Sequence, residues 1–330
     1  MTETQTLSHT SSLDRIVVDC AGAVKGGAAR LLREVQAYLS ETRPSNVELI
    51  GVGQRLTSKW LIQREILAAS AKRRISLNNA GFLNPRGENV TLLHNILQFA
   101  TAEDLEKLSF ERSRRLKVQT PIIRALAKSS KTLVVPCTRM AQQVEMVTPG
   151  LKDKLVVRFH PISKPNWAGT PPKRPRDILL PIVPAPYKNL DQHLPEFLEA
   201  SEGLPGGPVR LIVPSEPDSF PELASHPRVK FIGLQSSEEL DLWWRDSGAV
   251  FFPTEFEAFG FPLAEAQVYG RSAIAQDTDQ NRELAGHSLH PYDRHSHNSL
   301  RNAIETATIV VPIPDPDPFI PSSYFEWLLD

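Results

Sequence analysis

Short apolar runs alternate with amphipathic segments along the first half of this 330-residue chain. Residues 26–39 place Leu31, Val35 and Leu39 on one face of a helix, because these positions recur with the helical period. Strands that alternate with such helices are typical of a parallel sheet covered on both faces. Strands are predicted at residues 15–20, 47–52, 90–94, 133–136 and 155–159, and helices at 26–39, 58–71, after Thr101 as far as an interruption at Pro121, and at 139–147.

A proline-rich segment, residues 164–176, separates this half from a second alternating half. It holds four prolines and no apolar period, so it is interpreted as an interdomain linker. Two domains are therefore predicted, residues 13–165 and 166–330, after a Thr/Ser-rich leader, residues 1–12, that is expected to be disordered. In the second domain, strands are predicted at residues 177–183, 209–213, 229–232, 249–252 and 272–276, and helices at 190–200, from a capping box at Ser236 and Glu239 through Trp244, behind Pro262, and at 298–307.

Composition places the chain among soluble globular proteins, with 41% hydrophobic and 23% charged residues. No stretch approaches the ~18 apolar residues of a membrane-spanning helix. Cys20 and Cys137 lie in or beside apolar strands and do not suggest a disulfide framework, so a reducing cytoplasm is the default compartment. Residues 1–165 carry 25 Lys and Arg against 14 Asp and Glu, and residues 166–330 carry 12 against 24, which suggests that the two domains meet different partners.

Residues 251–270 (FFPTEFEAFGFPLAEAQVYG) hold the candidate chemistry. An apolar run leads into a glutamate-bearing turn, and Pro262 stands where a helix would begin. A helix N-terminus attracts phosphate through its unpaired N–H groups and its dipole, and Gly260 lets an anion approach the backbone. Glu257 and Glu265 would repel a phosphate but are suited to accept hydrogen bonds from hydroxyl groups. The stretch therefore predicts a site for a phosphate beside a sugar and a ribose.

The run from Glu257 to Pro262 (EAFGFP), followed by Glu265, resembles the donor-site motif of retaining glycosyltransferases of the GT-B fold, glycosyltransferase family 4. The family wording is E-G-F-G-L-P-x-x-E-A, and this chain has Ala258 for the first glycine and Phe261 for the leucine. The competing interpretation is an ordinary strand-loop-helix with solvated glutamates. The resemblance implies an α/β fold of two Rossmann-like, doubly wound domains that face each other across a cleft. It also implies a short last helix that crosses back to the first domain.

The resemblance further implies a role for each motif residue. Glu265 would hold the ribose hydroxyls, and Glu257 would bind hydroxyls of the donor sugar. Phe259 and Gly260, beside Phe261, would offer backbone N–H groups near the donor sugar and phosphate. No metal or other cofactor is expected, because a lysine and the helix dipole would neutralise the leaving diphosphate. The absence of an obvious nucleophile fits a front-face mechanism, in which the leaving phosphate and the attacking hydroxyl share one side.

Four further positions match the pattern of the family. Lys188 stands where a lysine binds the donor diphosphate, Gly26 and Gly27 resemble the glycine loop of the acceptor-side domain, and His94 stands where a histidine contacts the donor sugar. Simpler interpretations stay open for each: a solvated lysine, glycines that end a strand, and a structural histidine. The arginine that the family often has shortly before the lysine is replaced here by Val183, so the second cation would have to lie elsewhere.

Other acids and histidines are interpreted as structural. Two D-x-D patterns resemble the metal-diphosphate motif of the other large glycosyltransferase fold, but their positions favour loop acids. Four clustered histidines are expected to be solvated in a loop rather than to bind a metal. Glu283 matches a frequent family glutamate and is expected at the surface or at a helix cap. The D-x-D acids are Asp277, Asp279, Asp315 and Asp317, and the histidines are His287, His290, His295 and His297.

Basic and apolar residues mix in two helices predicted in the first domain. These helices could rest on an anionic membrane leaflet or hold a phosphorylated acceptor, and a core-packed helix with a basic solvent face is an equal alternative. One carries Lys59, Trp60, Leu61, Ile62, Ile66, Leu67, Lys72, Arg73 and Arg74, and the other carries Arg112, Arg114, Arg115, Lys117 and Arg124.

The resemblance thus implies a retaining, metal-independent, hexosyl-type glycosyltransferase that moves a sugar from a nucleoside-diphosphate sugar to an acceptor hydroxyl, in glycan, cell-envelope polysaccharide or glycoconjugate biosynthesis. The acceptor could be a saccharide, a lipid-linked molecule or a small molecule, and no nucleic acid is expected. The expected location is the cytoplasm, with a peripheral contact at the inner face of a membrane left open. A non-catalytic nucleotide-sugar-binding subunit and a nucleotide-sugar epimerase remain as alternatives.

Overall fold

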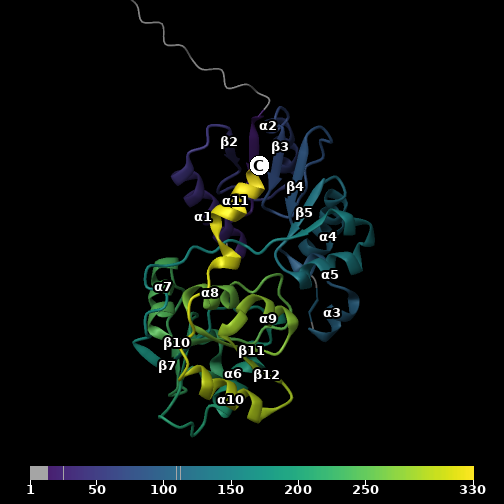
Figure 1. Cartoon of the computed structure of the whole chain (residues 1–330). Coiled ribbons are helices and arrows are strands. Elements are labelled where there is room, and N and C mark those ends of the chain that lie inside the picture. The colour runs from purple at the N-terminus through teal and green to yellow at the C-terminus, as the bar shows by residue number, and fades with distance from the viewer. Residues whose placement is uncertain (1–13, 25, 109, 112) are drawn as a thin grey trace, which may run out of the picture.

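The computed structural model describes residues 14–24, 26–108, 110–111 and 113–330. The predicted leader, residues 1–12, and Arg112 lie outside the described residues. Figure 1 shows two α/β domains, the first in purple to teal above the second in green to yellow. A six-stranded sheet forms the centre of each domain, and every strand pair in both sheets is parallel. The predicted α/β fold class is confirmed.

The first sheet has the strand order β2-β1-β3-β4-β5-β6. Helices cover both sides of this parallel sheet, so almost all residues of its four inner strands are buried. The strands are β1 (Ile16–Asp19), β2 (Val47–Ile50), β3 (Arg73–Ser76), β4 (Glu88–Leu92), β5 (Thr132–Val135) and β6 (Leu155–Val157), and the helices are α1 (Gly26–Thr42), α2 (Ser58–Leu67), α3 (Ala102–Lys107), α4 (Arg114–Ala127) and α5 (Thr138–Val147).

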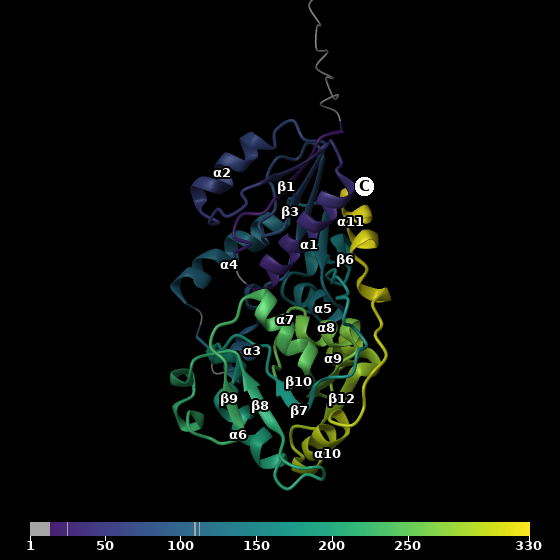
Figure 2. The same ribbon diagram turned by 90° about the vertical axis from the view of Figure 1, so that its left-hand side faces the viewer.

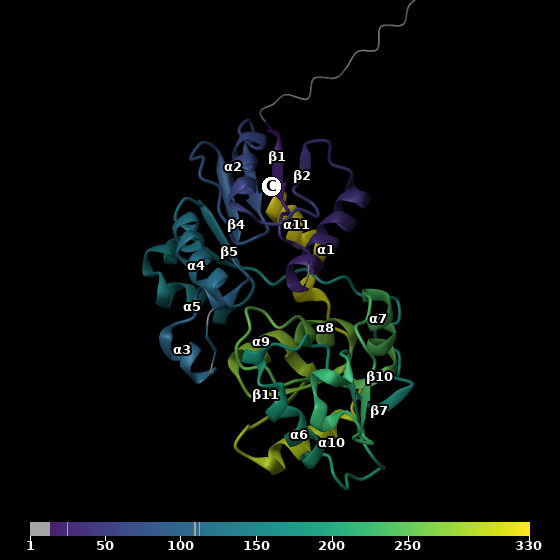
Figure 3. The ribbon, with the colours of Figure 1, turned by 180° about the vertical axis from the view of Figure 1, so that it is seen from behind.

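The second sheet has the order β12-β11-β10-β7-β8-β9, and every residue of its central strand β10 is buried. Figures 2 and 3 show its helices on both faces. The strands are β7 (Arg174–Leu179), β8 (Arg210–Val213), β9 (Val229–Phe231), β10 (Ser247–Phe252), β11 (Ser272–Gln276) and β12 (Leu289–Tyr292), and the helices are α6 (Leu190–Ala200), α7 (Ser237–Asp246), α8 (Phe261–Tyr269), α9 (Asp279–Ala285), α10 (His297–Ala307) and α11 (Pro321–Leu329).

The strand β3 was not predicted, and the placement of Arg73 and Arg74 on a helix was wrong. Helix α2 ends at Leu67, and both arginines lie on β3. The Arg74 side chain is buried, and its guanidinium donates to the carbonyl oxygens of Ala68 and Ala69, at 2.8 and 3.1 Å. Because an arginine has five N–H donors, it can lie in a core strand once carbonyls accept from them.

The single long helix predicted after Thr101 is two helices. Thr101 and Asp104 form the capping box that begins α3, but this helix ends at Lys107 and α4 begins only at Arg114. The predicted interruption at Pro121 is wrong, because Pro121 lies inside α4. The break in the helical pattern therefore falls before the proline rather than at it.

The helix α9 and the strand β12 are further differences from the prediction. The four histidines at residues 287–297 do not share a solvated loop. His290 lies on β12, where its Nε2 is 2.9 Å from the Ser272 hydroxyl, and His297 is the first residue of α10. His295 is exposed, as expected. The sequence LHPY hides this strand because Pro291 is unfavourable in a sheet, although an edge strand such as β12 tolerates it.

The last helix, α11, crosses back to the first domain, where Figure 1 shows it beside α1. Its Tyr324, Phe325 and Leu328 are buried in one apolar cluster with Leu31 and other residues of the first sheet and α1. The rings of Tyr38 and Phe325 pack with their centroids 5.2 Å apart. The core of the first domain therefore includes residues from the far end of the chain.

Candidate active site between the two domains

A cavity of about 530 Å³ lies between the domains, at the carboxyl ends of strands from both sheets. In parallel α/β sheets this is the edge where ligands bind. Loops after β1, β3 and β4 form one wall, and loops after β7 and β10 form the other. All but one of the predicted site residues line this cavity: Gly26, Gly27, His94, Lys188, Glu257, Phe259, Gly260 and Phe261.

The Lys188 ammonium lies 3.0 Å from the Glu257 carboxylate, and both side chains are mostly buried. Lys188 ends a short 3₁₀ turn, Pro186–Lys188, and Asn189 then adopts a left-handed conformation before α6. Glu257 comes from the turn between β10 and α8. Two loops of the second sheet thus bring together a cation and a carboxylate at the cavity wall. Val183 also lines the cavity, 70% exposed, so its side chain adds no charge there.

Helix α8 begins at the cavity with Phe261, one residue earlier than the predicted start at Pro262. Gly260 precedes it with φ 90° and provides no side-chain cap. Such a φ strains any L-residue. A Cβ atom on Gly260 would lie 3.5 Å from its nearest neighbours, an ordinary contact distance, so the backbone conformation and not a lack of space requires glycine here. The start of α8 therefore presents its dipole and backbone to the cavity without a competing side chain.

The Phe261 ring is enclosed by residues that the linear sequence keeps far apart. It stacks on the His160 imidazole with centroids 5.3 Å apart and planes 8° apart. The Arg30 guanidinium lies 5.2 Å from the ring centroid. A Cβ atom on Gly27 would lie 2.7 Å from Cε2 of the ring, closer than any real contact. The second glycine of the Gly26-Gly27 pair is therefore needed for this close approach between the domains.

Two histidines face each other in the cavity wall. The ring centroids of His94 and His160 are 5.9 Å apart, and the Nδ1 atoms of both rings are buried without a hydrogen-bond partner among the described residues. Burial lowers the pKa of His94 to about 4 and that of His160 well below its ordinary value. The Asn79 side chain accepts hydrogen bonds from the backbone N–H groups of His94 and Asn95, at 2.7 and 3.2 Å. Both rings are thus neutral at neutral pH, and Asn79 fixes the backbone at His94.

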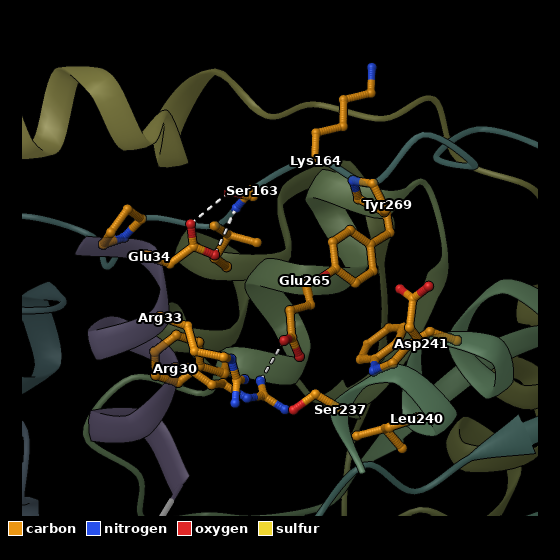
Figure 4. Close-up of a pocket in the computed structure, with 15 residues that line it drawn as sticks. Arg30, Arg33, Glu34, Ser163, Lys164, Ser237, Leu240, Asp241, Glu265 and Tyr269 are labelled. Atoms are coloured by element: carbon orange, nitrogen blue, oxygen red, sulfur yellow. Dashed lines mark hydrogen bonds and ion pairs between the residues drawn. The ribbon is translucent and has the colours of Figure 1, made fainter. Parts of the chain in front are cut away.

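A second cavity, of about 310 Å³, adjoins the first, and Arg30 and Phe261 line both. Figure 4 shows Glu265 of α8 pointing into it from the second domain, toward Arg30 of α1. Arg30 Nη1 lies 2.5 Å from Glu265 Oε1, while Glu265 Oε2 is buried and has no partner in the described structure. Burial raises the pKa of Glu265, against the opposing effect of Arg30. Glu265 therefore lines this cavity and has one buried oxygen that accepts no hydrogen bond from the described residues.

A buried network supports the loop after β1. The Asp19 carboxylate, fully buried at the end of β1, accepts from Arg64 Nη1 at 2.7 Å, Trp60 Nε1 at 3.0 Å and Asn78 Nδ2 at 2.8 Å. It also accepts from the Ala21 backbone N–H at 3.0 Å. Trp60 and Arg64 come from α2 and Asn78 from the loop after β3, so the network fixes the β1 loop that leads to the glycine pair.

Three of the other acids have hydrogen-bond partners, and Asp279, which was predicted in a loop, is instead the first residue of α9. Asp277 pairs with Arg282, Asp315 accepts from Gln267, and the Glu283 carboxylate accepts from the Thr138 hydroxyl at 2.6 Å. Glu283 also accepts from the backbone N–H of Thr138, the first residue of α5, so it caps a helix of the opposite domain. Among the described residues, no group of three or more His, Cys, Asp or Glu side chains is arranged to hold a metal ion.

No family model matches the chain, and no curated protein sequence matches it. Solved structures of several glycosyltransferases and a sucrose-phosphate synthase are similar to the structure of this chain. WaaG, a glycosyltransferase involved in lipopolysaccharide biosynthesis, aligns with a TM-score of 0.63 and 15% identity over 89% of this chain and 90% of WaaG. A sucrose-phosphate synthase from Thermosynechococcus elongatus aligns with a TM-score of 0.60 and 11% identity over 93% of this chain and 91% of the other. The fold is GT-B.

A third GT-B neighbour is AviGT4, a glycosyltransferase involved in avilamycin A biosynthesis, with a TM-score of 0.56 and 14% identity over 96% of this chain and 98% of AviGT4. Within this GT-B fold, sequence reasoning missed Arg30, Asn79 and His160, which line the same cavity. His160 follows β6 as His94 follows β4, so its place beyond a strand end was a usable signal. Arg30 gave no signal, because its partner lies 235 residues away.

Proposed function

We propose that this protein is a retaining glycosyltransferase that transfers a sugar from a nucleoside-diphosphate sugar to an acceptor hydroxyl without a metal. The observation that carries the proposal is the convergence of Lys188, Glu257 and the start of α8 on one interdomain cavity. A cation and a helix N-terminus at one wall match a leaving diphosphate, and a carboxylate beside them matches sugar hydroxyls. The volume of the cavity lies in the usual range for small-molecule sites, ~300–1,000 Å³.

In this proposal Lys188 and the α8 dipole stabilise the negative charge that develops on the diphosphate as the glycosidic bond breaks. The free oxygen of Glu265, in the adjoining cavity, accepts from the ribose hydroxyls. Glu257 is the carboxylate that lines the larger cavity in the described structure, and it is ion-paired with Lys188. A paired carboxylate is better suited to hold a hydroxyl than to attack carbon. This supports a front-face transfer with retention, helped by neutral His94 beside the donor sugar.

The test is to incubate the purified protein with UDP-, GDP-, ADP- and dTDP-sugars, with EDTA present, and to measure release of the nucleoside diphosphate. We expect slow release from one donor, unaffected by EDTA and abolished in Glu257→Gln. Glu255→Gln is the matched control, because Glu255 lies two residues away and pairs with Arg294 outside the cavity. The anomeric configuration of the product, read by NMR, then tests retention.

A non-catalytic nucleotide-sugar-binding subunit is the competing function, favoured by the uncharged Val183 at the cavity wall. Saturable binding of a nucleoside diphosphate without release from any donor, with the same affinity in Glu257→Gln, would support it. If EDTA abolishes the release of the nucleoside diphosphate and added Mg²⁺ restores it, the metal-independent mechanism is contradicted.

A lipid-linked acceptor is part of the proposal, because the first domain exposes apolar residues on adjacent helices. Ile62 and Ile66 of α2 are 69% and 73% exposed, and Val118 of α4 is 63% exposed. Leu61 of α2 packs against the cluster of Ala80, Ile123 and Leu126, and Figure 2 shows α2 and α4 on the same side of the first domain. No helix of the described residues is long and apolar enough to cross a membrane. A peripheral contact would use such an exposed apolar face with nearby cations.

Vesicle sedimentation tests this contact. Anionic vesicles should pellet the wild-type protein, and Ile62→Glu with Ile66→Glu should leave it in the supernatant, because a charge in an apolar contact is costly. The matched control is Ile309→Glu with Ile313→Glu, because these two isoleucines are also exposed but lie elsewhere in the chain. This control should pellet like the wild type. Equal pelleting of both double variants would exclude α2 as the contact.

A further inference from the structure

The ion pair between Arg30 and Glu265 joins the two domains across the boundary between the two cavities. Arg30 belongs to α1 of the first domain, and Glu265 belongs to α8 of the second. Nη1 and Oε1 are 2.5 Å apart, with the side chains 22% and 9% exposed. The pair is thus largely shielded from water, and its geometry depends on the two domains staying at their present separation.

Arg30 is also the second cation of the larger cavity. Apart from the neutral histidines, the basic side chains that line this cavity in the described structure are those of Arg30 and Lys188. Lys188 comes from the second domain and is already paired with Glu257. The Arg30 guanidinium lies over the ring of Phe261, the first residue of α8, so it stands beside the helix N-terminus that faces the cavity.

The chemistry of the two partners favours an exchange when a diphosphate enters. A planar guanidinium binds phosphate oxygens in a bidentate manner, with charge-assisted hydrogen bonds. Glu265 has one oxygen bound to Arg30 and one oxygen buried without a partner in the described residues. A buried acceptor without a donor is costly, so this carboxylate gains from the hydroxyl groups of an incoming ligand. Each partner of the pair can therefore be replaced by a different part of the same ligand.

We propose that Arg30 is the second cation of the diphosphate site, and that the Arg30–Glu265 pair is an interdomain contact which a nucleoside diphosphate replaces on binding. Arg30 then binds the diphosphate together with Lys188, and Glu265 accepts from the ribose hydroxyls. The inference rests on the proposed function, since it assigns the ligand chemistry of the same site. In the empty protein the pair keeps the arginine in position and limits the separation of the domains.

Inorganic pyrophosphate is the sharpest probe, because it carries the diphosphate without base or sugar. By isothermal titration calorimetry at fixed ionic strength, Arg30→Ala should weaken pyrophosphate binding by at least tenfold. Glu265→Gln should bind pyrophosphate as tightly as the wild type or more tightly, because Arg30 has lost its carboxylate partner. Arg33→Ala is the control for the loss of one positive charge, since Arg33 lies one turn along α1 and lines only the smaller cavity. It should weaken binding by less than threefold.

A second series uses UDP, GDP, ADP and dTDP with the corresponding nucleosides. Arg30→Ala should lose affinity for the matching diphosphate while nucleoside affinity is unchanged or higher, and Glu265→Gln should lose nucleoside affinity. Arg30→Lys keeps the charge and should recover part of the diphosphate affinity, which also shows that the variants fold. Equal diphosphate affinity of wild type and Arg30→Ala overturns the inference and leaves the proposed function standing. A wild-type protein that binds none of the four diphosphates overturns both.

Discussion

Gly27 and Phe261 meet across the domain boundary so closely that a Cβ atom on the glycine would lie 2.7 Å from Cε2 of the ring. The glycine opens α1 of the first domain, and the phenylalanine opens α8 of the second. Two helix starts of opposite domains are therefore in direct contact at the cavity. Neither partner can change size without moving the wall of the proposed donor site.

Gly27→Ala should reduce donor turnover by at least tenfold while leaving the fold intact. Gly27 has no positive φ, and alanine is favoured over glycine in a helix by ~1 kcal/mol, so the first domain itself should not lose stability. The added methyl group displaces the Phe261 ring instead. Nucleoside diphosphate release and the urea midpoint measure the two effects. Phe261→Leu in the same chain should restore part of the activity, whereas Gly150→Ala, in open space, should have no effect.

Lys188→Met should lower the rate of diphosphate release by about 10²-fold, the loss typical of one preorganised charge-stabilising group. The substitution keeps the length of the side chain and leaves Glu257 in the cavity without its cation. Steady-state release from the donor found in the panel is the measurement. Lys128→Met, an exposed lysine at the end of α4, is the control. Unchanged turnover in Lys188→Met would remove this lysine from the mechanism.

The histidine pair predicts a loss of stability in acid. Burial lowers the pKa of His94 from 6.5 to about 4, so the folded state binds this proton less tightly than the unfolded state. Stability is therefore complete above about pH 6.5 and falls as the pH decreases toward 4, by about 2–3 kcal/mol for this group. Burial also lowers the pKa of His160, so His160 too destabilises the folded state as the pH decreases. Urea unfolding of His94→Gln should show a shallower pH dependence than the wild type.

The control for this measurement is His295→Gln, because His295 is exposed. The free energy of unfolding of His295→Gln, plotted against pH, should run parallel to that of the wild type between pH 7 and pH 4. If the His94→Gln curve is also parallel, burial does not keep this imidazole neutral in the folded protein.

The buried pair of Asp19 and Arg64 should be far more important for stability than a surface pair in the same domain. Arg64→Met leaves a fully buried carboxylate without its cation, which should cost about 3–5 kcal/mol in the free energy of unfolding. Arg15→Met breaks a solvent-exposed pair with Glu48 and should cost less than about 1 kcal/mol. Chemical denaturation compares the two, and adding Asp19→Asn to Arg64→Met should recover part of the loss.

Sequence reasoning predicted most of the fold because buried parallel strands are continuous apolar runs. Residues 190–200 and 272–276 agree with α6 and β11 at every boundary. It failed where polar residues occupy strands. β3 (RRIS) carries two arginines: Arg74 donates to backbone carbonyls of the preceding segment, and Arg73 donates to the Leu328 carbonyl and the Glu88 carboxylate. Such partners leave no trace in a local pattern. β12 contains a proline that only its edge position allows.

The candidate site was predictable in its second-domain half and not at its interdomain contacts. The motif from Glu257 to Glu265 is local, so one helix start and its loop define it. Contacts such as Gly27 with Phe261 and Arg30 with Glu265 depend on the orientation of two separately folded sheets. Spacing within either domain carries no information on that orientation.

Helix α11 also has a consequence for how the protein is made. Residues 321–329 emerge from the ribosome after the whole second domain, yet they supply Phe325 and Leu328 to the core around β1 and α1. The first domain is therefore the first to be synthesised and the last to be completed. Until α11 arrives, the Tyr38 ring of α1 lacks its contact with Phe325, and this part of the apolar cluster is incomplete, although the segments that form the rest of the domain have already left the ribosome.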